Sequence, residues 1–269
     1  MKTEITPESS RNINFKELFH YKDLFIILAW RDLKVRYAQT ALGLAWAIIQ
    51  PLATLLIFTL IFGRAIQVNT GDVPYPVYAL AGMSAWAYFA FVMSQSGGSI
   101  ISSGEMIKKI YFPRLIIPLS KAIVALVDFL VTLGLLIILM VYHQITVKYT
   151  IFLLPVFFLI NVMASLAIGI WLSALTIRYR DFQHVIPFMV QIGLYTTPIA
   201  YPATLIPDKY QFIYHLNPMA GIVEGFRYAI LHQNEISDFS FVSYGIVLVL
   251  FGSSIWYFKK MERTMADLV

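Results

Sequence analysis

Glutamine, aromatic and hydroxyl side chains recur at intervals of three or four residues along three stretches. The longest series comprises Ser84, Tyr88, Phe91, Gln95, Ser99 and Ser102. The other two comprise His184, Phe188, Gln191, Tyr195 and Pro198, and Trp46, Gln50, Thr54 and Phe58. Residues at such intervals share one face of a helix. The sequence therefore predicts three helices that each present a glutamine flanked by aromatic rings.

These stripes suit contact with an uncharged, hydrated ligand. Aromatic rings stack on the apolar faces of sugars, and amide and hydroxyl groups hydrogen-bond to sugar hydroxyls. None of the stripes carries a formal charge unless His184 is protonated, so a neutral polymer fits better than an ion. The alternative for each residue is ordinary helix packing with interhelical hydrogen bonds. We expect a substrate conduit lined by Trp46, Gln50, Phe58, Ser84, Tyr88, Phe91, Gln95, Phe188, Gln191 and Tyr195.

Lys121 and Asp128 are the two charged residues within an otherwise apolar stretch, and they lie seven residues apart. This spacing puts both on one helix face, where they could form the proton relay of a secondary transporter. However, Lys121 lies near the predicted membrane boundary and can extend its ammonium group toward water. The alternative for Asp128 is a structural contact between helices.

The chain lacks a recognisable catalytic or metal-binding set. It has no Gly-Lys dipeptide and therefore no phosphate-binding P-loop, and it has no His-Glu-x-x-His motif. Its five histidines are scattered, and it has no cysteine for a disulfide, an iron–sulfur cluster or a thiolate metal site. A membrane-embedded glycosyltransferase or acyltransferase is therefore disfavoured. We expect no enzyme activity, metal or cofactor in this chain, and ATP would bind to another polypeptide.

The composition indicates which elements position the stripes. Of 269 residues, 59% are hydrophobic and 13% are charged, whereas soluble domains have roughly 45–50% and about 25%. The chain is therefore predicted to be an all-α integral membrane protein without a separate soluble domain. Because a spanning helix needs about 20 apolar residues, the windows poor in charge predict six transmembrane helices, at about 41–63, 76–98, 115–142, 150–176, 184–202 and 239–258.

The distribution of positive charge predicts the orientation. The side that contains both chain ends has fifteen Lys and Arg residues, whereas the opposite loops have only Arg64, Lys148, Lys209 and Arg227. Positive loops remain cytoplasmic, so both termini are predicted to lie inside the cell. The net charge of +5 then requires no nucleic-acid partner. The charged first forty residues do not resemble a cleavable signal.

Two charged segments on the cytoplasmic side are not predicted to span. Residues 14–37 have apolar side chains at helical spacing among charged ones, which predicts an amphipathic helix at the membrane surface, either an anchor or a docking surface. In residues 104–112, Glu105 precedes Lys108 and Lys109 by three and four positions, which favours a short helix. Such a helix could transmit force from a soluble motor, and the alternative is a solvated loop.

The predicted outer segment 201–238 is divided by Pro202, Pro207 and Pro218 into pieces too short to cross a membrane. We expect re-entrant or interfacial helices here, which would form a cap over an exit pathway or a structural plug. Glu224 and Arg227 lie three residues apart and are predicted to pair with each other.

Several motifs, in order along essentially the whole chain, resemble the membrane subunit of ABC-2 type exporters for lipid-linked polysaccharides. They are the segment from Arg36 to Trp46 followed by Gln50-Pro51, the Tyr111-Phe-Pro-Arg114 and Arg178-Tyr-Arg-Asp181 turns, and Leu216-Asn-Pro-Met219 with Arg227 downstream. This family includes O-antigen, capsule and teichoic acid permeases. The motifs do not specify the polymer.

The resemblance implies a type V exporter-like fold with a cytoplasmic segment at 1–40, a transmembrane domain at 41–258 and a cytoplasmic tail at 259–269. Residues 14–37 would be the interface helix, 104–112 the coupling helix and 205–232 the outer gate helices. The implied ATPase-coupling residues are Glu105, Lys108, Lys109 and Arg114. The implied gate residues are Arg178, Arg180 and Asp181 on the cytoplasmic side and Asn217, Glu224 and Arg227 on the outer side.

The resemblance also implies partners: a second copy of the chain, two ATPase subunits that bind ATP and Mg²⁺, and membrane lipids. The expected cargo is an undecaprenyl-type lipid-linked polysaccharide crossing the bacterial inner membrane. O-antigen is the leading candidate, with a capsular polymer or teichoic acid as alternatives. The alternative from another class is a proton-coupled secondary transporter that uses Asp128 and Lys121.

Overall fold

The structure, a computed structural model, describes residues 15–38, 41–233 and 236–262, which form helices and connections without any strand. Parts of the predicted N-terminal segment and tail lie outside these residues. The long helices are α3 (Ala45–Phe58), α4 (Tyr75–Ser102), α6 (Ile116–Tyr142), α7 (Leu154–Arg178) and α11 (Ser240–Glu262). The shorter α-helices are α1 (Phe15–His20), α2 (Lys22–Tyr37), α5 (Gly104–Lys109), α8 (Phe182–Thr196), α9 (Asp208–Tyr214) and α10 (Pro218–Leu231). A π-helix, η2 (Thr59–Ala65), continues α3, and 3-10 turns occur at η3 (Tyr149–Leu153) and η4 (Ala203–Leu205).

Five helical segments are long and apolar enough to cross a membrane: Ala45–Ala65, Tyr75–Ser102, Ile116–Tyr142, Tyr149–Arg178 and Ser240–Glu262. They correspond to five of the six predicted spans. The predicted span at 184–202 differs, because α8 ends at Thr196 after 15 residues, a length of about 22 Å. Thr197 is extended because the following Pro198 disfavours the helical conformation in the residue before it.

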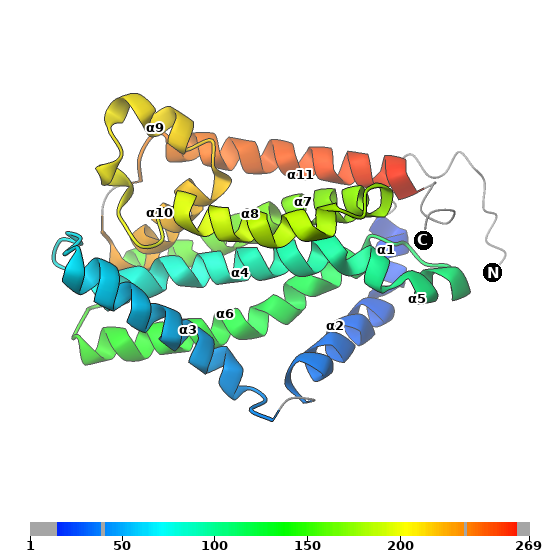
Figure 1. Cartoon of the computed structure of the whole chain (residues 1–269), viewed down its shortest axis with the longest axis horizontal. Helices are drawn as coiled ribbons and strands as arrows, with labels where there is room; N and C mark the ends of the chain where they lie inside the picture. The colour runs from blue at the N-terminus through cyan, green and yellow to red at the C-terminus, as the bar shows by residue number, and fades with distance from the viewer. Residues whose placement is uncertain (1–14, 39–40, 234–235, 263–269) are drawn as a thin grey trace.

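Helix α4 is the centre of the bundle and packs against α6 and α7, while α7 also packs against α11 (Figure 1). Small residues allow these close approaches. A Cβ added at Gly169 of α7 would lie 2.7 Å from the Ser96 Cβ of α4. The Phe129 and Phe158 rings of α6 and α7 stack at 4.5 Å between centroids. The packed core therefore includes α4, α6 and α7, and it also includes α10, most of whose residues are buried against α4, α7 and α11.

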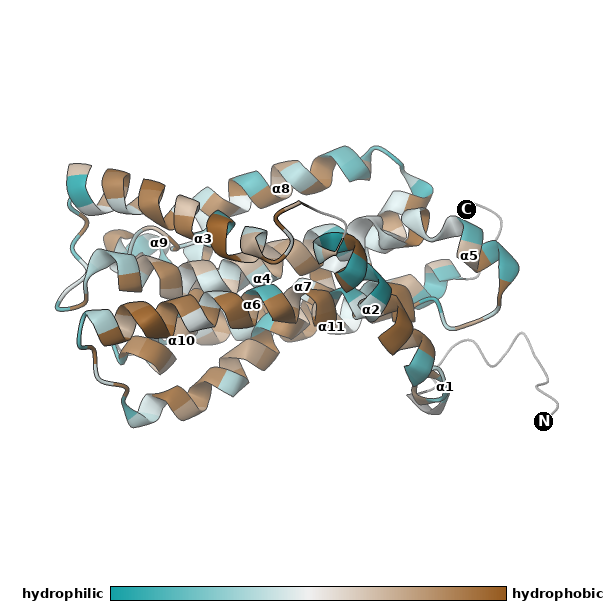
Figure 2. Ribbon diagram, turned by 90° about the horizontal axis from the view of Figure 1, so that it is seen from below, coloured by the Kyte–Doolittle hydropathy of each residue, from teal (hydrophilic) through white to brown (hydrophobic). Residues whose placement is uncertain are grey.

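Helices α1 and α2 replace the single amphipathic helix predicted over 14–37, with a break at Tyr21. Leu28 and Ala29 are buried, whereas Ile26 and Trp30 are 60% and 59% exposed. Of the charged residues of α2, Asp32 and Arg36 face α6, whereas the others are exposed. As Figure 2 shows, α2 crosses obliquely near α6. This distribution fits a helix whose apolar side chains contact lipid.

Ion pairs join α2 to α6. Lys121 of α6 pairs with Asp32, and Asp128 of α6 pairs with Arg36 and accepts a hydrogen bond from the Tyr37 hydroxyl. Lys121 and Asp128 therefore both bind side chains of α2. These contacts correspond to the structural alternative considered for Asp128.

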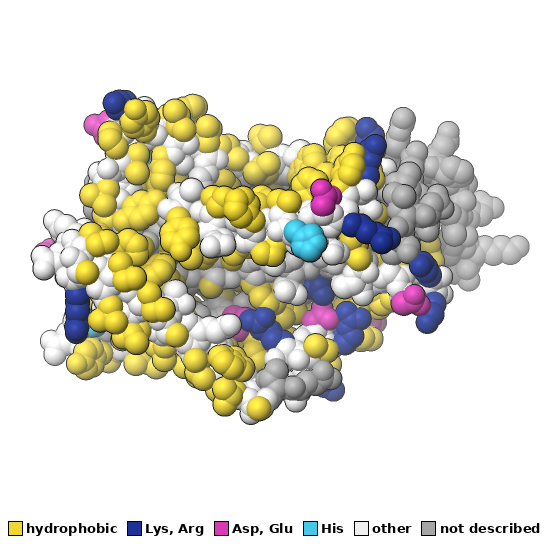
Figure 3. Space-filling model, in the orientation of Figure 1, with side chains coloured by type: hydrophobic (Ala, Val, Ile, Leu, Met, Phe, Trp, Pro, Cys, Tyr) yellow, Lys and Arg dark blue, Asp and Glu magenta, His cyan; other side chains and the backbone are white. Residues whose placement is uncertain are grey.

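Helices α1 and α5 and the C-terminal end of α11 lie at one end of the bundle, and α9 and α10 lie at the other (Figure 1). On the face drawn in Figure 3, apolar side chains cover most of the bundle, and most charged side chains gather at the end that carries α1 and α5. The backbone N–H of Arg114 donates to Glu262 Oε1 at 3.1 Å, and its guanidinium donates to the Glu262 carbonyl at 2.8 Å. This contact joins the turn before α6 to the end of α11.

Candidate functional site

Helices α3, α4 and α8 form an open face. Within α3 only Ala47 and Leu55 are buried, and within α8 only Ile186 is buried. Figure 1 shows α8 on one side of α4 and α3 on the other. On the part of α4 between them, Ala87 and Gln95 are exposed and Phe91 is half-buried. Two of the predicted stripes therefore lie on α3 and α8, which the rest of the chain leaves largely uncovered. The third lies on α4, part of which is exposed between them.

Most of the predicted conduit residues lie at the surface of these helices. Trp46, Phe188 and Tyr195 are 46%, 62% and 66% exposed. Gln50, Gln95 and Gln191 are also exposed, and Phe58 is half-buried. The open face thus combines amide groups with aromatic rings and can contact a polar, uncharged ligand.

Ser84 and Tyr88 differ from the rest of the stripe on α4 because both are buried in the core. The Ser84 hydroxyl donates to the Ala81 carbonyl at 2.8 Å, and the Tyr88 hydroxyl donates to the Ala122 carbonyl at 3.2 Å. The Tyr88 ring centroid lies 5.0 Å from that of Phe158. We therefore correct the prediction that these two residues line a conduit. Helical spacing identified their shared face, but α6 and α7 cover Tyr88.

Arg36 contributes to the open face and was not identified from the sequence as a site residue. Its guanidinium lies 4.3 Å from the centroid of the Phe91 ring while it pairs with Asp128. In the sequence, Arg36 stood out only as the first residue of the family-like segment that ends at Trp46. Arg36 lies directly before the uncharged window that begins at residue 37. This position could have indicated that Arg36 lies close to the membrane-spanning helices.

At the end of the bundle that carries α1, α5 spans Gly104–Lys109 and is shorter than the predicted 104–112 helix. It stops because Ile110 is extended, ahead of the turn at Pro113. Glu105 and Lys109 form an exposed ion pair at 3.8 Å. A cavity of about 210 Å³ separates α5 from the end of α7, and its wall includes Glu105, Lys108 and Arg180. Two predicted coupling residues and one predicted gate residue therefore border the same cavity.

Arg114, Arg178 and Asp181 have other surroundings. Arg114 binds Glu262 and joins helices rather than projecting from α5. Arg178 and Asp181 are exposed, and the Arg178 guanidinium lies 5.4 Å from the centroid of the Tyr179 ring. The turn that carries them is thus accessible at the surface.

At the opposite end, α9 and α10 are the short helices predicted between residues 205 and 232. Asn217 caps α10, since its Oδ1 accepts from the Met219 N–H at 3.0 Å. Its Nδ2 donates to the Thr197 hydroxyl at 2.9 Å. Asn217 therefore links the start of α10 to the end of α8.

The prediction that Glu224 pairs with Arg227 is wrong. Among the ion pairs of the described residues, Glu224 instead faces His215, at 3.2 Å from Nε2. Arg227 is 4% exposed and donates to the carbonyls of Ile199 at 2.6 Å, Tyr201 at 3.4 Å and Tyr78 at 3.4 Å. Burial lowers the pKa of Arg227.

His215 forms a second contact at this end that the sequence did not reveal. Its Nδ1 lies 2.8 Å from the Gln211 carbonyl, and because a carbonyl only accepts, Nδ1 must carry a hydrogen. Burial lowers the pKa of His215, but hydrogen bonding to Glu224 and Gln211 outweighs burial, so the pKa is raised. The Ser240 hydroxyl donates to Glu224 at 2.6 Å. Glu224 thus connects the end of α9 with α11.

An all-helical chain with five membrane-length helices and an open, amide-rich face has the features of a membrane transport protein. Residues 23–231 match the ABC-2 type transporter family, and the chain belongs to this family. The sequence-based resemblance is therefore confirmed.

Relatives of the chain include proteins named for glycan export. The O-antigen export system permease protein RfbA of Klebsiella pneumoniae is 29% identical over 252 residues, which cover 92% of this chain and 95% of the relative. RfbA of Myxococcus xanthus is 27% identical over 254 residues, which cover 92% and 96%. The polysialic acid transport protein KpsM of Escherichia coli is 26% identical over 234 residues, which cover 82% and 89%.

Proposed function

We propose that this chain is the membrane permease subunit of an ATP-driven exporter of lipid-linked polysaccharide, with O-antigen as the cargo. The observation that carries this proposal is the open face of α3, α4 and α8 with its exposed amides and rings. Within a membrane, exposed glutamines at Gln50, Gln95 and Gln191 are costly against lipid. A hydrated glycan would satisfy their hydrogen-bonding groups.

The open face further suggests that two copies of the chain enclose the conduit. A second copy placed against α3 and α8 would shield the exposed amides from lipid and surround the polymer. The Phe188 and Tyr195 rings would then contact sugar faces. An undecaprenyl-type lipid carrier would remain in the surrounding bilayer, near the uncovered sides of the same helices.

In this proposal the chain crosses the bacterial inner membrane six times, with both termini in the cytoplasm. Helix α8 with the extended residues after it makes the crossing that α8 alone is too short to complete. ATPase subunits that bind ATP and Mg²⁺ would contact α5 from the cytoplasm. Movement of Glu105 and Lys108 would reach Arg180 through the cavity that these residues border.

A capsular polymer is the alternative cargo, since KpsM is among the relatives, and teichoic acid is a further one. The alternative from another class, a proton-coupled carrier, would require Asp128 and Lys121 to exchange protons. Both side chains instead contact charged partners on α2, which favours an anchoring role.

The proposal is tested in a strain that lacks this chain but retains its cognate ATPase. Expression of the chain should restore polysaccharide at the cell surface, and the ATPase should copurify with it. Changing Glu105, Lys108 and Lys109 together to Ala should abolish copurification, whereas Lys148→Ala with Lys209→Ala should not. Uptake driven by a proton gradient in liposomes without the ATPase would refute the proposal.

The conduit is tested separately with Tyr195→Ala. We expect surface polysaccharide to fall by about tenfold, the loss of roughly one stacking contact, while ATPase copurification is unchanged. Tyr142→Ala is the matched control, because Tyr142 is 78% exposed at the end of α6 and away from the open face. Equal export by the two variants would show that the Tyr195 ring does not contact the polymer and would contradict the proposed conduit.

A further inference from the structure

Two adjoining cavities lie beside α10, at the end of the bundle opposite α5. The larger has a volume of about 280 Å³ and extends between η4, α9 and α10. The smaller has a volume of about 240 Å³ and extends toward the loop that includes Thr70. Tyr78, Thr204 and Gln233 border both cavities, which together are called the hollow below.

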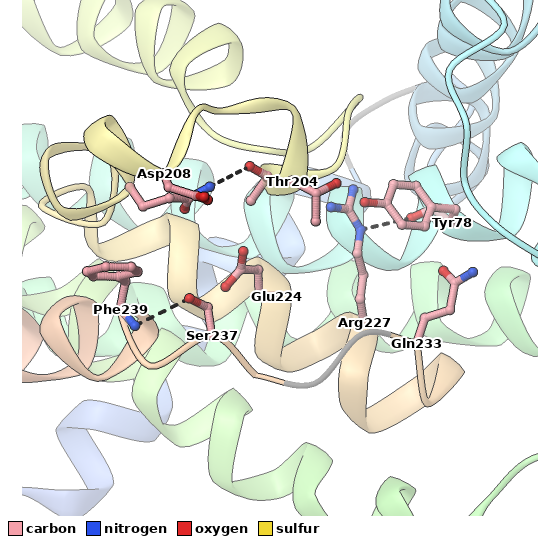
Figure 4. A pocket seen from close by; sticks show the side chains of 10 residues that line it. Tyr78, Thr204, Asp208, Glu224, Arg227, Gln233, Ser237 and Phe239 are labelled. Carbon is pink, nitrogen blue, oxygen red and sulfur yellow. Dashed lines mark hydrogen bonds between the residues drawn. The ribbon is translucent and has the colours of Figure 1, made fainter.

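Charges of both signs border the larger cavity. Figure 4 shows the side chains of Glu224, Arg227 and Asp208 around it. Two carboxylates disfavour an anion such as phosphate, and the guanidinium disfavours a metal ion. Because a typical ligand pocket measures about 300–1,000 Å³, this hollow suits a small ligand that is neutral and polar.

Unsatisfied hydrogen-bonding groups point to the same kind of ligand. Gln233 donates through Nε2 to the Thr70 carbonyl, but its buried Oε1 has no partner among the described residues. The Arg227 guanidinium, which has five N–H groups, donates to three carbonyls and also contacts the Tyr78 ring. A free acceptor beside a donor-rich guanidinium suits a hydroxyl-rich ligand.

We propose that this hollow is a binding site for a neutral pyranose unit. The carboxylates of Glu224 and Asp208 would accept hydrogen bonds from sugar hydroxyls, and Gln233 would accept through Oε1. Arg227 would donate to the sugar oxygens. The Phe239 ring, at the opposite wall from Tyr78, offers an apolar surface for a sugar face. Other neutral polyols share this chemistry, and the choice of a sugar rests on the proposed function. Under that function the site lies on the outer side of the membrane and holds the polymer as it emerges.

The site is tested by titrating the full chain in lipid nanodiscs with the methyl pyranosides of glucose, galactose, mannose and N-acetylglucosamine. Saturation-transfer NMR should detect millimolar binding of at least one. Thr204→Trp should weaken this binding about tenfold or more, because it places a large ring at a residue that borders both cavities. Leu205→Trp is the matched control, since Leu205 is 62% exposed and does not border the cavities, and it should bind as the wild type does.

A second variant guards against a folding defect in Thr204→Trp. Asp208→Ala removes an exposed carboxylate from the wall and should weaken pyranoside binding about threefold to tenfold, with an unchanged unfolding temperature. Inorganic phosphate and Ca²⁺ are titrated in parallel. The inference is overturned if no pyranoside binds, if Thr204→Trp binds normally, or if either ion binds at the blocked site instead.

The inference and the proposed function fail in distinguishable ways. Normal restoration of surface polysaccharide without any pyranoside binding would overturn the site alone. Pyranoside binding that Thr204→Trp blocks, in a chain that restores no surface polysaccharide, would overturn the export function and leave the sugar site.

Discussion

The contact between α2 and α6 and the region around α10 hold charged side chains in different ways. In the first, Lys121 and Arg36 each face a carboxylate, on Asp32 and Asp128. In the second, Arg227 faces three backbone carbonyls and lies 3.7 Å from the centroid of the Tyr78 ring. The first arrangement joins two helices, whereas the second also supports backbone that is not helical, at Ile199 and Tyr201.

The difference follows from what each region must stabilise. Helices α2 and α6 satisfy their own backbone groups, so only side chains are available to join them. Ile199 and Tyr201 lie in an irregular segment between α8 and η4, where carbonyls have no helical partner. A guanidinium with several donors can satisfy such carbonyls together.

Removal of Arg227 should have the largest effect on stability. Arg227→Met leaves the carbonyls of Ile199 and Tyr201 without this donor and should lower the free energy of unfolding by about 3 kcal/mol or more. Thermal unfolding followed by tryptophan fluorescence would measure this loss. Lys209→Met, an exposed cation of α9, should change the free energy by less than about 0.5 kcal/mol. Equal stability of the two variants would show that Arg227 does not support the segment.

Breaking the Lys121–Asp32 pair should have a smaller effect. Lys121→Met leaves Asp32 with only the neighbouring Arg31 and should lower the free energy of unfolding by about 2 kcal/mol. Adding Asp32→Asn should recover part of this loss, because the unpaired charge is removed. A double-mutant cycle with no coupling would contradict the role of this pair in joining α2 to α6.

Asp128→Asn tests whether the other pair is only structural. The amide still accepts from Tyr37 but loses the charge that faces Arg36, so stability should fall by about 1 kcal/mol. Polysaccharide export should persist with an unchanged pH profile. Loss of export from a stably folded Asp128→Asn protein would instead assign Asp128 a role in transport.

The smallest expected effect is the pH dependence of stability at the contact between His215 and Glu224. The pKa of His215 is raised above its ordinary value of 6.5, so its stabilising contact with Glu224 is complete below pH 6.5 and is lost as pH rises through the raised value. The wild-type unfolding temperature should therefore fall across that interval relative to His215→Gln. Parallel pH profiles for the two proteins would show that the His215–Glu224 contact contributes no stability.

Hydropathy predicted most of the fold. Five of the six predicted spans correspond to membrane-length helices, because about 20 consecutive apolar residues have few alternatives to crossing a bilayer. The sequence also contained the signal for the exception. Pro198 lies two residues after Thr196, the last residue of α8, but the predicted span followed the uncharged window past this proline.

Side-chain partners were less predictable. Glu224 and Arg227 are three residues apart on α10, but each finds a partner on another element, His215 and the carbonyl of Ile199 among them. The spacing of residues along the sequence predicts which side chains are neighbours on one helix. It does not predict which segments from elsewhere in the chain pack against them.

The sequence by itself determined a helical membrane protein with amide and aromatic stripes, since apolar length and helical period are local properties. Only the tertiary structure decided that Tyr88 is buried while Gln95 is exposed on the same stripe. Exposure depends on which helices cover a face, and that depends on packing across the whole chain. The same is true of the hollow beside Arg227, whose walls come from segments more than one hundred residues apart.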